Sequence, residues 1–281
     1  MKLVVLIDNT PNPTNPSLEI EHGLSLYIEW ETTKILLDVG ASDKFLHNAE
    51  KLHIDIKDID YLILSHAHND HTGGLSYFLH HNKKASIFLS AYIGNKGYYS
   101  TRGGKVKDLS IDFNLVQNNK RRFKAVSETI SLTPSITIIG AIPHTHTLPK
   151  ANKTLFAGSS LDSFDHEIAL FIHRKDKACL LSSCTHVGLL NTLESCNTPI
   201  TAFVGGLHLL NSDTRDLLNS DTRDLFESEQ EIASLGETIK TKYPHLQIYS
   251  GHCTGTKAQQ TLSTILANHW HSFYTGFELV I

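Results

Sequence analysis

The chain alternates between short apolar runs and segments with helical periodicity. Apolar runs that partly alternate with polar residues are typical of β-strands. On this basis we predict strands over residues 2–7, 24–30, 34–39, 59–64, 85–90, 135–142, 167–173, 177–183, 200–206 and 246–251. Residues 42–54 and 73–81 instead place their apolar side chains on one helical face, and helices are expected after the last three strands. Interleaved strands and helices without a linker predict one layered α/β domain over residues 1–281.

Residues 94–124 interrupt this pattern. They are rich in Gly, Lys, Tyr and Asn and have little periodicity, so we predict a long loop or small subdomain inserted into the domain. Long loops are often functional, and we expect this one to lie over the active site and bind substrate. Its cations outnumber its acidic residues, Asp108 and Asp112. The cations are Lys96, Arg102, Lys105, Lys107, Lys120, Arg121, Arg122 and Lys124.

The basic excess suggests an anionic substrate. We expect Arg121 and Arg122 to bind a phosphate group, because Arg and Lys attract and clamp anions. Tyr98 and Tyr99 could stack on a flat ring of the same substrate. The alternative is a solvated basic surface without a ligand.

Composition narrows the class of protein. The 281 residues are 40% hydrophobic, which is enough for a substantial core. A formal net charge of −4 gives no reason to expect nucleic acid as a partner, and no apolar run reaches the roughly 20 residues of a membrane span. We therefore expect a small-molecule substrate, no nucleic acid and no membrane, and the oligomeric state stays open. The cysteines form no Cys-x-x-Cys pair and the N-terminus has no signal-peptide pattern, so we expect a reduced, cytoplasmic protein.

The sequence LNSDTRDL occurs twice in direct succession, at 210–217 and 218–225. Solenoid repeats are about 20 residues or longer and need several copies. We therefore interpret the repeat as a tandem duplication at an exposed loop or helix start, where insertions cost little stability. Deleting residues 218–225 should then leave the melting temperature and the metal content nearly unchanged.

Histidine is unusually frequent, at 18 of 281 residues, and several histidines share one context. In each case an apolar strand is followed by a small residue, a histidine and a predicted helix. In layered α/β folds ligands bind beyond the carboxyl ends of the strands, so these histidines would meet in one cleft. The segments are LILSHAHNDH (62–71), CLLSSCTH (179–186), TAFVGGLH (201–208) and LQIYSGHC (246–253).

The first of these segments has the spacing of a two-metal site. Residues i and i+2 of an extended chain point the same way, so His66 and His68 can bind one ion. Asp70 and His71 fall where the chain turns into a helix and can face a second ion. Imidazole and carboxylate ligands suit zinc, and also manganese or iron. We therefore expect two divalent metal ions, with zinc favoured.

The sequence HAHNDH followed by TGGL resembles the metal-binding motif of the metallo-β-lactamase superfamily. One branch of it, represented by 7,8-dihydropterin-6-methyl-4-(β-D-ribofuranosyl)aminobenzene-5′-phosphate synthase, is similar in further segments. The resemblance implies a four-layer αββα sandwich of metallo-β-lactamase type, with a binuclear site at one edge of the paired sheets. The further segments are EHGLSLYIE (21–29), ILLDVGAS (35–42), SCTHVGLLN (183–191), GGLHLL (205–210) and GHCTG (251–255).

The resemblance also implies a ligand set. For the third ligand of the first ion, His186 is favoured over His144 and His146, which follow another strand. Cys184 stands where many superfamily members have an aspartate that bridges the metals; it could bridge as a thiolate or be a small buried residue. The expected ligands are His66, His68 and His186 for the first ion, and Asp70, His71 and His252 for the second.

Three residues have expected roles beyond simple ligation. Asp70 should hold both a metal and the proton of the attacking hydroxide. His208 should overhang the cleft, where it could hold substrate or donate a proton to a leaving group. His22 precedes a strand rather than following one, so a structural hydrogen bond is favoured there, although the branch resemblance is compatible with a place at the site.

Together these features predict a metal-dependent hydrolase that acts on a phosphate-bearing or other anionic small molecule. Two metal ions would make hydroxide available near neutral pH. Two alternatives stay open. A synthase-like transferase would use the metals to bind a pyrophosphate leaving group while an arylamine attacks a pterin cation. A non-catalytic metal-binding sensor would keep the fold without turnover, but the intact histidine motif favours an enzyme.

Overall fold

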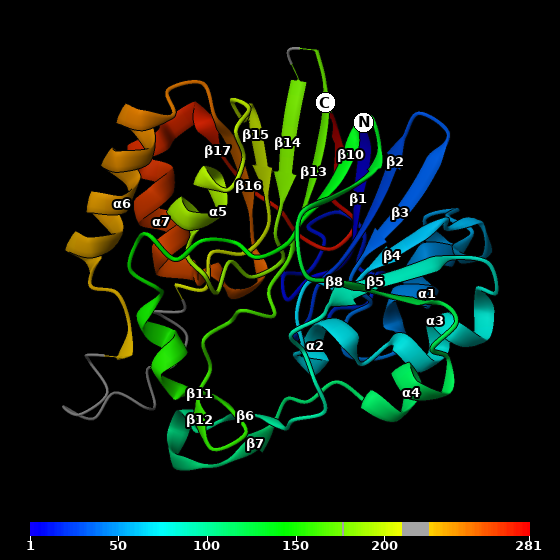
Figure 1. The fold of residues 1–281 in the computed structure, drawn as a ribbon. Helices are drawn as coiled ribbons and strands as arrows, with labels where there is room; N and C mark the ends of the chain where they lie inside the picture. Colours follow the sequence, from blue (N-terminus) through cyan, green and yellow to red (C-terminus); the bar gives the residue numbers. More distant parts are fainter. Residues whose placement is uncertain (176, 210–224) are drawn as a thin grey trace.

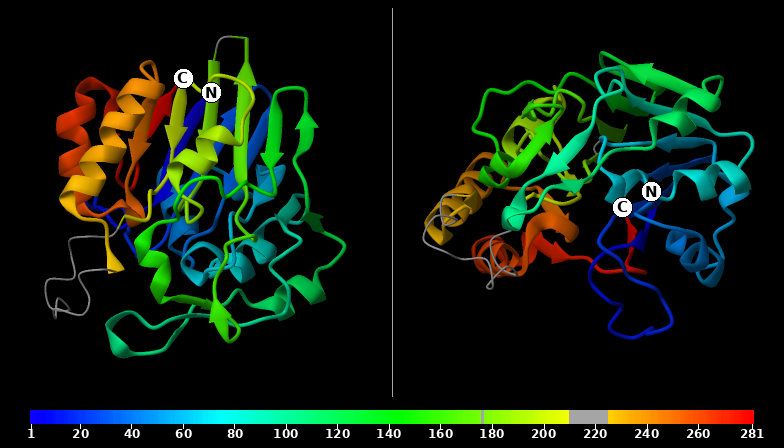
Figure 2. Two further views of the ribbon diagram at one scale, coloured as in Figure 1. Left: turned by 60° about the vertical axis from the view of Figure 1, so that its left-hand side comes forward. Right: turned by 90° about the horizontal axis from the view of Figure 1, so that it is seen from below.

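Two seven-stranded β-sheets pack face to face, and helices cover the outer face of each sheet (Figure 1). The computed structural model describes residues 1–175, 177–209 and 225–281. Figure 2, in the view from below, separates the helices of the two outer layers. The predicted αββα sandwich is confirmed. The outer helices are α1 (Lys44–Lys51) and α3 (Leu75–His81) on the first sheet, and α5 (Leu189–Glu194), α6 (Glu229–Lys242) and α7 (Thr256–Leu266) on the second.

The first sheet combines the N-terminal part of the chain with its last strand, in the order β18-β1-β2-β3-β4-β5-β8. Strands β3, β4, β5 and β8 pair in parallel, and the other neighbours pair antiparallel. The strands are β1 (Lys2–Ile7), β2 (Ser25–Trp30), β3 (Thr33–Leu37), β4 (Tyr61–Ile63), β5 (Ser86–Ser90), β8 (Phe123–Val126) and β18 (Glu278–Val280).

The second sheet has the order β17-β16-β15-β14-β13-β10-β9. Strands β14 to β17 pair in parallel, and the rest pair antiparallel. Every strand predicted from the apolar pattern is present in one of these two sheets. The strands are β9 (Ile130–Thr133), β10 (Ile136–Ile139), β13 (Ala169–Arg174), β14 (Lys177–Leu181), β15 (Ala202–Val204), β16 (Gln247–Ser250) and β17 (Trp270–Ser272).

The central strands are apolar on both faces because both faces are covered. Along β1, Leu3 and Val5 belong to the core between the sheets, whereas Val4 and Leu6 pack with Phe45 of α1. The same alternation runs through the second sheet, whose outer core includes side chains of α5, α6 and α7. Packing on both faces fixes the strands, so their carboxyl ends are held in place for a site.

The insertion at 94–124 contains regular structure rather than only a loop. Two short strands of this segment pair with two strands of a later segment in a separate sheet of order β12-β11-β6-β7, which we call the small sheet. Asn69 N–H donates to Leu109 O at 2.8 Å, which joins the small sheet to the segment after β4. In Figure 1 the small sheet lies below the two main sheets. Its strands are β6 (Tyr98–Ser100), β7 (Lys107–Asp108), β11 (Leu155–Ala157) and β12 (Ser160–Leu161).

The remaining helices are short and connect the larger elements. None of the helices in the described ranges is long and apolar enough to cross a membrane. The tandem repeat lies outside the described residues except for Leu225. The short helices are η1 (Ile56–Asp58), α2 (Asn69–Thr72), η2 (Arg102–Gly104), α4 (Phe113–Asn118), η3 (Lys150–Thr154), η6 (His252–Thr254) and η7 (Ala267–His269).

Candidate metal centre

The loops that leave the parallel strands bring the predicted donor side chains to one edge of the sandwich. These loops follow β4 in the first sheet and β14, β15 and β16 in the second. Carboxyl ends of parallel strands share an edge, so donors far apart in sequence become neighbours. The side chains that meet there are His66, His68, Asp70, His71, Cys184, His186, His208 and His252.

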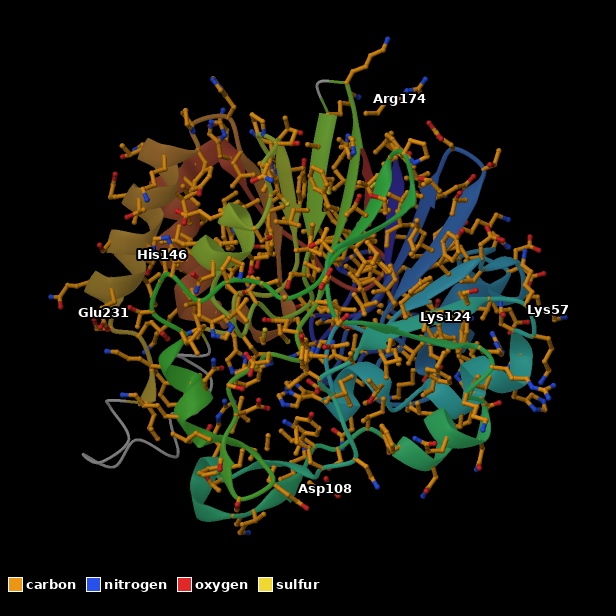
Figure 3. The ribbon with its side chains drawn as sticks, viewed as in Figure 1. Lys57, Asp108, Lys124, His146, Arg174 and Glu231 are labelled. Atoms are coloured by element: carbon orange, nitrogen blue, oxygen red, sulfur yellow. The ribbon has the colours of Figure 1, made fainter. Side chains whose placement is uncertain are left out.

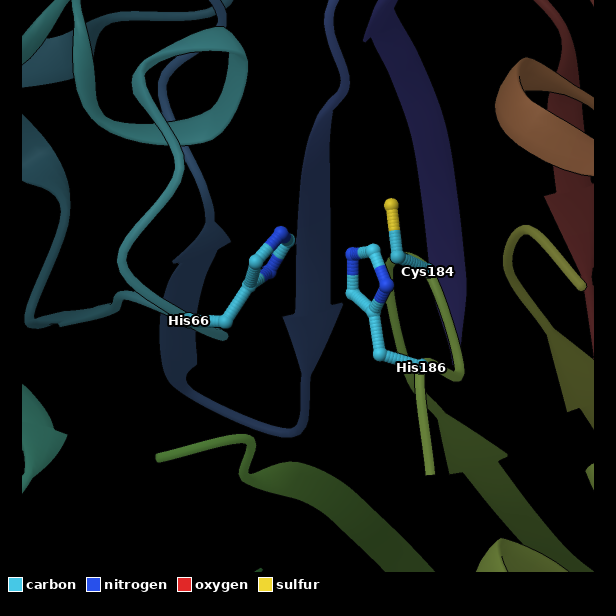
Figure 4. A group of neighbouring side chains, drawn as sticks. All are labelled: His66, Cys184 and His186. Carbon is cyan, nitrogen blue, oxygen red and sulfur yellow. The ribbon is translucent and has the colours of Figure 1, made fainter. Parts of the chain in front are cut away.

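One group of donors consists of His66, Cys184 and His186. Their ligand atoms lie within 4.8 Å of one another and all three residues are buried. Figure 4 shows the three side chains pointing toward a common centre. His66 Nδ1 lies 2.8 Å from Ser65 Oγ, and His186 Nδ1 lies 3.1 Å from Asn152 Oδ1. The Nε2 atoms of both rings are buried without a hydrogen-bond partner, so each ring leaves Nε2 for an ion.

A second group consists of His71, Cys184 and His252, with Asp70 beside them. His71 Nε2 lies 3.2 Å from Cys184 Sγ and 3.2 Å from His252 Nε2. Asp70 Oδ2 lies 3.5 Å from His71 Nε2 and 3.6 Å from His252 Nε2. A tetrahedral site with bonds of about 2.0 to 2.3 Å has edges of roughly 3.3 to 3.8 Å. The four donor atoms therefore have nearly the spacing of one tetrahedral shell.

The protonation of the rings suits metal binding. Burial lowers the pKa of His66, His186 and His252 well below its usual range, so these imidazoles are neutral near pH 7, which is the ligand form. Burial also opposes the charged form of His71, but Asp70 and Asp38 raise the pKa of this ring to about 9. Burial raises the pKa of the Cys184 thiol, so an ion would have to displace its proton.

Cys184 is common to both groups, which is the position expected of a bridging residue. It also forms a third group with His208 and Cys253, and Cys253 Sγ lies 3.4 Å from Cys184 Sγ. Sequence reasoning gave Cys253 no role, because it directly follows a predicted ligand and no motif marks it.

His68 lies beside the first group without being part of it. Its ring centroid is 4.7 Å from that of His66 and 4.9 Å from that of His186. Burial lowers the pKa of His68 to about 3. Tyr98 packs edge-on against this ring, is fully buried, and donates its hydroxyl to Ile93 O. The prediction that Tyr98 stacks on substrate is therefore wrong, because its ring forms part of the wall behind His68.

The structure separates the two alternatives for the third donor of the first group. His186 is buried within it, whereas His144 is exposed. His146 Nε2 lies 2.9 Å from Glu194 Oε2, at the end of α5. Figure 3 shows His146 on the helical side of the second sheet. Geometry therefore supports His186.

A cleft of about 260 Å³ opens onto these groups. His208 lines it with both ring nitrogens buried and without a hydrogen-bond partner, and its ring centroid lies 4.0 Å from that of His186. His22 lines it too: its Nε2 lies 3.5 Å from Asp70 Oδ2, and its ring stacks on His252. His22 thus faces the site, although we had favoured a purely structural role for it.

Two cations of the insertion line the cleft, but they are not the ones we chose. Arg102 and Lys107 face it. The guanidinium of Arg122 instead donates to Asn82 O, Asn82 Oδ1 and Ala85 O, which fasten β8 to the loop before β5. The prediction that Arg122 binds substrate is wrong because its donors are already used. The adjacent Arg121 is likewise not among the residues that line the cleft.

Several supporting residues escaped the sequence reasoning. Buried Asp38, directly after β3, accepts hydrogen bonds from Ser65 N–H at 2.7 Å and Ser65 Oγ at 2.6 Å, and lies 2.8 Å from His71 Nδ1. Asn9 Oδ1 lies 3.0 Å from His252 Nδ1. The only available signal was a polar residue at the carboxyl end of a strand, as in LLDVG.

Backbone strain is concentrated in the same loops. Asp38, Thr185, His208 and His252 have φ between 47° and 60° although none of them is glycine. Such conformations cost of order 1 kcal/mol or more and persist where the surrounding packing enforces them. Each residue lies a few positions after a strand, so the sheets hold these side chains in unusual orientations at the site.

Comparison with known proteins identifies the class. The family model described as "Metallo-beta-lactamase superfamily" matches residues 20–146, which include the HAHNDH segment. The chain belongs to the metallo-β-lactamase superfamily, as its motif, its fold and its clustered donors together indicate.

Individual relatives lie at moderate distance. A curated protein of Methanocaldococcus jannaschii, named 7,8-dihydropterin-6-methyl-4-(beta-D-ribofuranosyl)-aminobenzene-5′-phosphate synthase, is 28% identical and covers 91% of this chain and 88% of its own. The crystal structure of Tm1679, described as a metal-dependent hydrolase of the β-lactamase superfamily, superposes with a TM-score of 0.79 at 26% identity, covering 100% of this chain and 99% of that one. Zn²⁺-bound PqqB from Methylobacterium extorquens shares the fold, with a TM-score of 0.58 at 14% identity over both whole chains.

Proposed function

We propose that this protein is a binuclear metal-dependent hydrolase that acts on a phosphate-bearing or other anionic small molecule. The observation that carries the proposal is the pair of buried donor groups that share Cys184 at a cleft lined by cations. Membership of the superfamily supports a metal-dependent, hydrolase-type fold.

The donor chemistry fits two divalent ions, and a thiolate among imidazoles favours zinc over manganese or iron. When bound, such a pair supplies an acidified water and a Lewis acid for the oxygen under attack. One ion would be held by His66, His68 and His186, and the other by Asp70, His71 and His252, with Cys184 between them.

Two further roles belong to the chain itself. Asp70 keeps an ionised carboxylate, because the positive charge of His71 and His252 outweighs burial and lowers its pKa. It can therefore accept a hydrogen bond from the attacking water and orient it. His208 presents unpartnered ring nitrogens to the cleft, so it can donate a hydrogen bond to the departing oxygen.

The test is turnover of bis(4-nitrophenyl) phosphate by protein reconstituted with zinc or manganese, with metal content measured on the same sample. We expect close to two equivalents of metal per chain and phosphodiester hydrolysis that exceeds hydrolysis of nitrocefin. His68→Ala should abolish turnover and lose at least one equivalent, whereas His144→Ala, a histidine outside the cluster, should change neither. Absence of metal after reconstitution, or faster turnover of nitrocefin, would overturn the proposal.

The similarity to the curated synthase favours one second candidate, a transferase with a related reaction. The same cations would then hold a pyrophosphate leaving group. Release of pyrophosphate from a dihydropterin pyrophosphate, dependent on an added arylamine, would identify it. A metal-loaded protein without turnover in either assay would instead be a metal-binding sensor.

A further inference from the structure

Arg102 is a cation whose hydrogen-bonding capacity is unused inside the cleft. Its Nε and Nη2 atoms are buried, and neither has a hydrogen-bond partner in the part of the chain that the structure describes. Its guanidinium carbon lies 5.9 Å from the ring centroid of Phe226, so an aromatic ring packs close to it. A guanidinium has five N–H donors and no acceptor, so only an acceptor from outside the chain can use these groups.

The fold holds Arg102 in place. Arg102 N–H donates to Ser100 Oγ at 3.2 Å, and Thr101 N–H donates to Thr154 O at 2.8 Å, which ties η2 to η3. Gly103 and Gly104 follow with φ of 73° and 72°, the left-handed conformation that glycine adopts without strain. The chain can therefore turn back at once into β7, which brings Lys107 to the same cleft.

The charge of Arg102 acts on the candidate metal centre across the cleft. After burial, Arg102 is the largest cause that lowers the pKa of His208, and it also contributes to the lowered pKa of His22. A buried cation with unmet donors is costly in free energy unless an anion completes its hydrogen bonds. The cleft therefore favours a bound anion between the small sheet and the donor groups.

We propose that Arg102, with Lys107 beside it, binds the phosphate group of the substrate. The inference rests on the proposed function and adds the residue that selects the substrate. The guanidinium fork matches two oxygens of one oxyanion, as in a phosphate or a carboxylate. A second cation at the same cleft favours the group with the greater negative charge, which is phosphate.

The direct test is calorimetric titration of inorganic phosphate into zinc-loaded protein. Losing a charge-assisted hydrogen-bonding group weakens binding by about 10- to 100-fold, and we expect this loss for Arg102→Met. Arg102→Lys should recover part of the affinity, because it keeps the charge without the fork. Arg121→Met, a neighbouring arginine of the insertion outside the cleft, is the matched control and should bind phosphate as the wild type does.

A kinetic test separates substrate binding from the chemical step. Arg102→Met should raise KM for bis(4-nitrophenyl) phosphate more than it lowers kcat, and should leave hydrolysis of the neutral ester 4-nitrophenyl acetate unchanged. Should Arg102→Met not fold, Lys107→Met, at an exposed position, should show a smaller loss of phosphate affinity in the same titration.

Three results would overturn the inference: unchanged phosphate affinity in Arg102→Met, an equal loss in Arg121→Met, or acetate binding as tight as phosphate. Metal content and turnover are measured separately. Loss of phosphate binding in Arg102→Met in a protein without hydrolytic activity would refute the proposed function and uphold this inference. Hydrolysis without any dependence on Arg102 would do the reverse.

Discussion

The imidazoles of the donor groups are oriented by hydrogen bonds at Nδ1. Ser65, Asp38, Asn152 and Asn9 each contact one of these nitrogens, at 2.8 to 3.1 Å. The contact fixes the ring and leaves Nε2 for an ion, and a carboxylate partner also makes the ring more basic. The residues that orient the rings should therefore matter for metal affinity almost as much as the rings do.

Asp38 offers the clearest test of this idea. Asp38→Asn keeps the size of the side chain but removes the charge that faces His71 Nδ1 at 2.8 Å. We expect zinc affinity to fall about 10- to 100-fold, the usual effect of losing such a supporting carboxylate. Competition with a chromogenic chelator measures the change. Asp43→Asn, outside the site, is the control; an equal loss in both variants would show that the effect is not specific.

The choice of third donor is also decided at the level of residues. His186→Ala should weaken zinc binding by roughly 10-fold or more, because it removes a ring of the first group. The double change His144→Ala with His146→Ala should leave affinity unchanged, since His146 is engaged with Glu194. The same chelator competition reads both. If the double variant loses metal while His186→Ala keeps it, the third donor belongs to the PHTHT segment.

Residue types and local spacing predicted the donors but not their partners. A histidine after an apolar strand can be recognised in the sequence, which is how His186 and His252 were found. Asp38 could not be assigned, because its contact with His71 depends on how two strands are packed. The cations show the same limit: charge alone does not distinguish Arg102, which faces the cleft, from Arg122, which fastens β8.

Among the elements, the long-range sheets were more predictable than the small sheet. Strands of the two main sheets are covered on both faces, so their sequences are nearly continuous apolar runs. Strands of the small sheet have two or three residues each, and β6 pairs with β11 from a segment more than 50 positions later. So short a strand has no measurable periodicity, and the sequence indicated only an irregular insertion.

Helix α6 allows a prediction at the level of the element. Its N-cap Ser228 and Glu231 form a capping box, and Glu231 also lies 2.6 Å from Lys150 Nζ. Ser228→Ala should lower the free energy of unfolding by about 1 kcal/mol, as for other lost caps. Chemical denaturation measures it, and Ser263→Ala, an exposed serine inside α7, is the control. A loss in the control as large as that in Ser228→Ala would contradict a capping effect.

The same cap has a pH dependence of defined sign. Hydrogen bonds from Lys150 and Ser228 lower the pKa of Glu231 from 4.5 to about 2 in the folded protein. A lowered carboxyl pKa adds stability above pH 4.5, and this stability is lost as the pH falls from 4.5 toward 2. The contribution is small because the group is largely exposed. Glu231→Gln should flatten the acid side of the stability profile between those values, and an unchanged profile would contradict this assignment.

In the whole molecule, the candidate metal centre joins the two halves of the sandwich. His66, Asp70 and His71 belong to loops of the first sheet, whereas Cys184, His186 and His252 follow strands of the second. An ion held by both sets would link the sheets at this edge. Metal binding and global stability should therefore be coupled, because the unfolded chain does not hold these donors together.

Removing metal should accordingly lower the melting temperature of the whole domain. A ligand that binds only the folded state at 1,000 times its Kd adds about 4 kcal/mol. For a domain of this size that corresponds to a shift on the order of 10 °C. Calorimetric scans with and without a chelator measure it. Cys184→Ser removes the donor common to both groups, so its scan should shift less on chelation than that of Cys196→Ser, a cysteine at the end of α5 away from the site. A melting temperature independent of chelator in the wild type would mean that the donors do not hold an ion across the sheets.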